Sequence, residues 1–134
     1  MEEIKFRAWS KSSKKMVPVC GIDNWDYQDD HENKYITSGG EGVYQWNDIV
    51  LMQYTGLKDK NGVEIYEGDV LRCPKEEMHI SIRWDTSGAG WQFDEHDTFD
   101  DGVGRGDWRL TSGIAKDGEV VGNIYENPEL LTNN

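Results

Sequence analysis

Cysteine is scarce in this chain, and the local patterns that mark catalytic or metal-binding sites are missing. The two cysteines, Cys20 and Cys73, lie far apart and form no Cys-x-x-Cys pair. His31, His79 and His96 are isolated and lack the i, i+4 spacing of a helical zinc motif. No serine lies in a nucleophile-elbow pattern. These absences predict a protein that has no catalytic residues and needs no metal or cofactor.

Long hydrophobic runs are also absent. The longest apolar run, Ile49 to Met52, is far too short to cross a bilayer, and residues 1–3 lack the features of a signal peptide. We therefore expect a cytoplasmic protein without a membrane partner. A chain of 134 residues can bury a core without disulfides or metals, so a single domain over residues 1–134 is the simplest organisation.

Positive charge is in short supply. The chain has 14 Lys and Arg against 26 Asp and Glu, which gives a formal net charge of −12. Residues 21–48 carry −6 and residues 76–107 carry −7, whereas residues 1–20 carry +3. A field of this sign repels phosphate backbones, so direct nucleic-acid binding is disfavoured.

What the chain does contain is a dense set of turn and strand signals between Tyr54 and Val70. Asn61-Gly62 is a favoured pair for a tight turn whose central residues need positive φ. Gly68-Asp69 is a second break, just before the apolar Val70-Leu71. The stretch predicts a β-turn that leads into a strand.

Period-two alternation predicts further strands with one buried face each, at Ile4–Trp9 and at His79–Trp84. The second run places Ile80, Ile82 and Trp84 on one face. Residues 16–22 are expected to pair with the first strand as a hairpin, with Pro18 at an edge. Other predicted elements are a helical turn at Trp46–Asp48, a strand from Ile49 that ends at Thr55-Gly56, a hairpin arm at Trp91–Phe93 and a strand at Val120–Tyr125.

A short C-terminal helix is predicted after Asn127. The side-chain oxygen of Asn127 is placed to accept a hydrogen bond from a backbone amide one turn further on. Pro128 suits the first helical position because the N–H that it lacks would have no partner there. Glu129 suits the positive end of the helix dipole. Leu130 and Leu131 are expected to dock the helix, so their loss should destabilise the fold.

Three separated blocks resemble the YopX family of bacteriophage and prophage proteins. They are Ile4–Trp9 with Met16, Tyr54–Val70, and Val121–Leu131, which together span nearly the whole chain. The resemblance implies a mainly β fold of several coiled β-sheets that include an SH3-like barrel. We expect an N-terminal hairpin and acidic segment over residues 1–48 and the barrel core over about 49–131. A bacterial host is also implied, but no activity, since the family is largely uncharacterised.

Positions that match the family's blocks supply the candidate site residues. The expected partner surface comprises Tyr54, Asp59, Tyr66, Glu67, Asp69 and Trp84. The expected architectural positions are Gly56, Asn61, Gly62, Gly68, Gly122, Asn123, Asn127, Pro128, Leu130 and Leu131.

Three functional hypotheses follow. The first is a non-enzymatic binding or assembly module that uses an aromatic patch or a sheet edge to bind an unidentified host or phage protein; edge strands also invite self-association. The second is an acidic decoy that mimics DNA and occupies a host nucleic-acid-binding protein. The third is a metal-assisted hydrolase built from Asp94, His96, Asp97 and His31. The acidic loop 94–101 does not fit the EF-hand register, and a solvated loop is the favoured interpretation.

Overall fold

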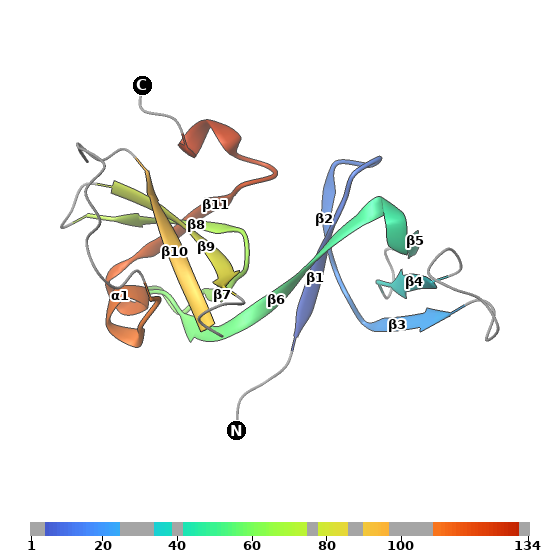
Figure 1. Ribbon diagram of the computed structural model, residues 1–134, viewed down its shortest axis with the longest axis horizontal. Coiled ribbons are helices and arrows are strands. Elements are labelled where there is room, and N and C mark those ends of the chain that lie inside the picture. Colours follow the sequence, from blue (N-terminus) through green and yellow to red (C-terminus); the bar gives the residue numbers. More distant parts are fainter. Residues whose placement is uncertain are drawn as a thin grey trace. The chain divides into compact units, whose positions relative to one another are not determined.

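The computed structural model of the protein describes residues 5–24, 34–38, 42–74, 78–85, 90–96 and 109–131. The chain is mainly β, with three antiparallel sheets, and its described residues include one short α-helix (Figure 1). It divides into two compact units, residues 1–54 and residues 55–134. The predicted fold class is confirmed, whereas the expectation of a single domain stays a prediction.

The first unit contains two small sheets with a shared core. β1 pairs with β2 and with the first half of the long strand β6, and β4 lies between β3 and β5. The core is formed by Ala8, Val17, Ile36 and Ile49. The elements are β1 (Phe6–Ser10), β2 (Lys15–Pro18), β3 (Gly21–Asn24), β4 (Lys34–Thr37), β5 (Val43–Gln45), the 3-10 helix η3 (Trp46–Asp48) and β6 (Ile49–Lys58).

Two expectations for this unit are confirmed: Ala8 lies on the buried face of β1, and Pro18 lies in an edge strand. The hairpin expected with the first strand is also confirmed, since β2 pairs with β1, but this strand ends at Pro18 and does not run on to Ile22, because the chain changes sheets there. The amide of Val19 donates to Phe6 in β1, but the amide of Cys20 donates to Thr37 in β4. Pro18 is the last residue of β2, and the new strand β3 begins at Gly21.

The second unit is built on a strongly curled half-barrel of four strands in the order β10-β9-β8-β11. The short strand β7 pairs with the end of β6 (Figure 1). The helix α1 contributes Ala115 to the core. The core also buries Ile65, Leu71, Ile80 and Phe93. The elements are β7 (Glu64–Tyr66), β8 (Asp69–Cys73), β9 (Met78–Asp85), β10 (Gly90–His96), α1 (Ser112–Asp117), β11 (Glu119–Asn123) and the 3-10 helix η4 (Pro128–Leu131).

The middle stretch corrects two details of the sequence prediction. β6 does not end at Thr55-Gly56 but runs on to Lys58, because Gly56 adopts a φ of +88° within the strand. In the next loop only Gly62 has a positive φ, +82°. The amide of Gly62 donates to the carbonyl of Asp59 over 3.0 Å, which closes a turn followed by a left-handed glycine. This is the pattern of a three-residue hairpin loop.

No helix in the described ranges is long and apolar enough to cross a membrane.

Candidate functional site

A pair of tryptophans lies at one end of the curled sheet in the second unit. Trp84 in β9 and Trp91 in β10 are directly opposite each other, with ring centroids 5.0 Å apart and ring planes inclined by 76°. This edge-to-face arrangement is favourable for aromatic rings. Trp84 is 44% exposed, whereas Trp91 is half-buried and packs against the core. We call this pair the aromatic rim.

The aromatic rim continues the apolar inner face of the sheet. Because side chains alternate along a strand, Trp84 and Trp91 share a face with the next pair inward, Ile82 and Phe93, which is buried. The prediction that Trp84 follows Ile80 and Ile82 on one face is therefore confirmed. At Trp84 this apolar face emerges from the core and reaches solvent.

The turn between β7 and β8 lies beside this end of β9. The amide of Gly68 donates to the carbonyl of Ile82 over 2.8 Å, and Gly68 has a φ of +89°. A carboxylate oxygen of Asp69 accepts the amide of Tyr66 at 2.7 Å and so holds the turn closed. Tyr66 and Glu67, both half-buried, are therefore held on the turn next to the strand that carries Trp84.

A second polar feature of this unit is the carboxylate of Asp59, which is surrounded by backbone amides. One of its oxygens accepts from Asn61 at 2.8 Å and from Val63 at 2.9 Å; the other accepts from Val120 in β11 at 2.8 Å. Burial alone would raise the pKa of this carboxyl, but the three amides and the nearby Lys60 outweigh it and lower the pKa below its ordinary value. Asp59 is therefore held as an anion.

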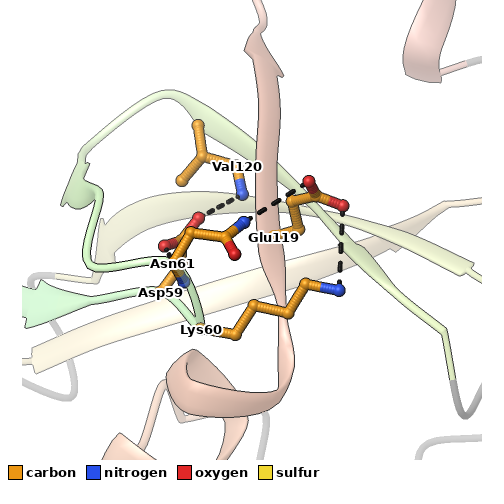
Figure 2. A network of polar contacts seen from close by, with 5 residues as sticks. All are labelled: Asp59, Lys60, Asn61, Glu119 and Val120. Atoms are coloured by element: carbon orange, nitrogen blue, oxygen red, sulfur yellow. Dashed lines mark hydrogen bonds and ion pairs between the residues drawn. The ribbon is translucent and has the colours of Figure 1, made fainter.

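Asp59 joins the hairpin loop to the last strand of the sheet. Figure 2 shows its carboxylate reaching Val120, while Lys60 and Asn61 both reach the side chain of Glu119. The Lys60–Glu119 ion pair spans 3.9 Å and is exposed, so it adds little. The buried carboxylate makes the main connection, because hydrogen bonds to a charged group are the stronger ones.

The structure separates the six expected partner-surface residues into two groups. Tyr54, Asp59 and Asp69 are only 6%, 5% and 2% exposed, so these three side chains offer little surface to a partner. The two acids serve as acceptors for backbone amides, and the ring of Tyr54 lies under the ammonium of Lys5, 5.5 Å away. The remaining three, Tyr66, Glu67 and Trp84, gather at the end of the curled sheet.

At the C-terminal block, the side chain of Asn127 has a different role from the expected helix cap. The side chain of Asn127 does not cap η4; its oxygen accepts the amide of Asn123 at 3.2 Å. The buried Asn123 makes the turn instead, because its own side-chain oxygen accepts from Tyr125 at 3.0 Å and from Glu126 at 2.8 Å. Pro128 starts η4 as predicted, and Leu130 is half-buried.

Glycine is required beside this turn. A Cβ built on Gly122 would lie 2.4 Å from the side-chain oxygen of Asn127, closer than any real contact. The sequence Gly122-Asn123 therefore lets the Asn127 side chain approach the strand.

The residues of the hydrolase hypothesis are not brought together in the described part of the chain. The two carboxylate oxygens of Asp94 share the Nε–H of Arg83 on the neighbouring strand, each at 3.1 Å. His31, Asp97 and the side chain of His96 lie outside the described residues, as does most of the acidic loop 94–101. Among the side chains that are described, no group of three or more His, Cys, Asp or Glu is arranged to hold a metal ion.

Sequence reasoning missed α1 and the Arg83–Asp94 pair. Local signals for α1 were present, since Thr111 caps the helix by accepting the amide of Ile114 at 3.2 Å and Gly118 follows its end. The Arg83–Asp94 pair depends on the register of β9 and β10, which no local pattern specifies.

Three comparisons with known proteins bear on identity. A family model described as YopX protein matches residues 5–132. Among solved structures, the crystal structure of protein EF1440 from Enterococcus faecalis is similar, with a TM-score of 0.59 and 29% sequence identity. The similarity covers 98% of this chain and 99% of that chain. No curated protein matches.

Proposed function

The chain belongs to the YopX family, and on this premise we propose that it is a non-enzymatic protein-binding or assembly module of phage or prophage origin, acting in the cytoplasm of a bacterial host. The observation that carries the proposal is the aromatic rim, in which the exposed Trp84 is supported by the half-buried Trp91. Its partner is a host or phage protein.

Tryptophan and tyrosine are the side chains that contribute most to protein interfaces, particularly when their neighbours already hold them in place. Trp84 has this support because its ring contacts the ring of Trp91 in an edge-to-face arrangement, and Trp91 packs against the core. Little side-chain entropy is then lost when a partner covers the exposed part of Trp84. Tyr66 and Glu67, on the adjacent turn, supply polar groups for the rim of such an interface.

The charge of the second unit favours a protein partner over a nucleic acid. Residues 55–134 contain seventeen Asp and Glu against eight Lys and Arg, a net charge of −9. A surface of this sign raises the free energy of any phosphate backbone brought near it. The DNA-decoy and hydrolase hypotheses gain no supporting observation from the described residues.

The proposal is tested by affinity purification from the bacterial host, with the whole chain as bait and with Trp84→Ala beside it. We expect the wild type to capture a specific protein and Trp84→Ala to lose it, because truncating a central aromatic costs about 2 kcal/mol or more of binding free energy. Trp84 is at the surface, so its truncation should leave the midpoint of thermal unfolding close to that of the wild type.

Val63→Ala is the matched control, since Val63 is similarly exposed in the same unit but does not belong to the aromatic rim. This variant should capture the same protein as the wild type. Equal capture by wild type and Trp84→Ala would refute the proposed role of the rim, and the absence of any specific protein would argue against a binding module.

A further inference from the structure

The first unit contains a polar groove that the proposed function does not use. It has a volume of about 750 Å³ and lies between the turn after β1, the edge strand β5 and the helix η3. We call it the β5 groove; its walls carry the hydroxyls of Ser10, Ser12 and Ser13, the carboxylate of Asp48 and the backbone of Gly42–Gln45.

The wall opposite β5 is held rigid by Asp48. Its carboxylate accepts the hydroxyl of Ser12 at 2.6 Å, the amide of Ser12 at 3.2 Å and the hydroxyl of Ser10 at 3.3 Å. The amide of Lys11 donates to the Asp48 carbonyl at 2.8 Å. With these bonds made, the turn is fixed against η3, and the Asp48 carboxylate is engaged by the protein's own donors.

The wall formed by β5 is a strand edge that pairs with no other strand among the described residues. β5 is the last strand of its sheet, and the amide of Ser38 donates to the carbonyl of Gly42 at 2.9 Å. Because backbone groups alternate in direction along an antiparallel strand, Val43 turns both its N–H and its C=O away from β4, and Gln45 turns its N–H the same way. Within the described ranges these groups of Val43 have no hydrogen-bond partner, and its side chain is 62% exposed.

The charge beside the groove is opposite to that of the chain as a whole. Lys11 and Lys14 are exposed on the turn that forms one wall, and Lys15 is exposed at the start of β2. The side chain of Lys11 donates to the carbonyl of Asn47 at 3.4 Å. Against them stands Asp48, so this wall carries a surplus of positive charge in a chain of net charge −12. An acidic ligand is attracted here, although most of the protein repels it.

We propose that the β5 groove binds an extended acidic segment of a partner protein, which adds to the edge of β5 as a further strand and directs its carboxylates toward Lys11 and Lys14. Strand addition satisfies the outward backbone groups of Val43 and Gln45, which gives affinity without demanding a fixed sequence. The lysines then select acidic segments over basic ones. This surface belongs to the other unit from the aromatic rim, so neither proposal depends on the other.

The test uses the whole chain and two short fluorescent peptides, one alternating valine with glutamate and the other valine with lysine. We expect fluorescence anisotropy to show saturable binding of the glutamate peptide, weakened by added salt, and no saturable binding of the lysine peptide. Hydrogen exchange of the Val43 and Gln45 amides should slow when the glutamate peptide is bound. Failure of the glutamate peptide to bind, or equal binding of both peptides, would overturn the proposal.

Two variants locate the bound peptide. The double change Lys11→Glu and Lys14→Glu should weaken binding by about tenfold or more, whereas the matched control Lys116→Glu, on α1 in the second unit, should not. A glutamate peptide methylated on alternate backbone nitrogens should also bind about tenfold more weakly, because it cannot complete the ladder. Unchanged binding in both experiments would place the peptide elsewhere. If sedimentation shows that the chain forms a dimer and that the glutamate peptide dissociates this dimer, the groove binds a second copy of the chain instead.

Discussion

Asp59 shows how one residue can serve as a joint between segments far apart in the sequence. Its two oxygens receive amides from a hairpin loop and from β11, 61 residues further along the chain. No hydrophobic contact could replace these bonds, because the three amides would be left without acceptors. Sequence reasoning placed Asp59 on the expected partner surface, and its connection to β11 could not be predicted because it depends on the tertiary fold.

The lowered pKa of Asp59 predicts a pH-dependent contribution to stability. The unfolded chain, with a carboxyl pKa of about 3.9, binds the proton more tightly than the folded protein. Stabilisation by the carboxylate is therefore complete above that value and is lost as the pH falls through the lower folded pKa. We expect Asp59→Asn to reduce the free energy of unfolding by about 1–3 kcal/mol at neutral pH.

The difference between wild type and Asp59→Asn should shrink as the solution is acidified, because the wild-type carboxyl then becomes neutral too. Urea unfolding followed by tryptophan fluorescence at a series of pH values measures this. A difference that stays constant down to the lowest pH would show that the charge of Asp59 does not stabilise the fold.

A side chain at position 122 is expected to clash with Asn127. Gly122→Ala places a methyl group on the Asn127 side chain, which must move and lose its bond to Asn123. We expect a loss of about 1–3 kcal/mol in the free energy of unfolding. Gly113→Ala is the matched control, because its Cβ would meet only Thr111 at 3.8 Å and alanine favours a helix. If thermal unfolding shows equal effects for both variants, the close approach of Asn127 does not constrain this position.

At the scale of the elements, alternation and turn residues predicted most of the strands. Ile80 and Ile82 revealed the buried face of β9, and Gly68 marked the turn before β8. Local patterns could not show that Gly56 lies within a strand, since a glycine with positive φ usually ends one. Nor could they show which of Trp84 and Trp91 reaches solvent, because burial depends on what packs over a strand end.

Thr111 provides a prediction for the helix that sequence reasoning missed. Thr111→Ala removes the side-chain acceptor of the Ile114 amide and should destabilise α1 by about 1 kcal/mol. Hydrogen exchange should then be faster at Ile114 and Ala115. Thr111→Ser keeps the hydroxyl, so these two amides should exchange at the wild-type rate in that variant. Fast exchange of the two amides in both variants would mean that the hydroxyl does not cap the helix.

At the scale of the whole molecule, each unit has a core of its own. Ile36 belongs to the core of residues 1–54 and Leu71 to that of residues 55–134. Leu71→Ala should reduce the free energy of unfolding by about 2–5 kcal/mol and lower the hydrogen-exchange protection mainly in the second unit. Ile36→Ala should have the same effects mainly in the first unit. Native-state hydrogen exchange compares the two variants. Equal loss of protection in both units would indicate one cooperative domain.

β6 has a consequence for how such chains diversify. The boundary between the units, at Tyr54 and Thr55, falls inside this ten-residue strand, which pairs with β1 near its start and with β7 near its end. A genetic crossover that replaced one unit with that of a relative would join two partial strands, and each part would have to keep its register with its neighbouring strand. Inheritance of both units together is therefore favoured over the exchange of single units.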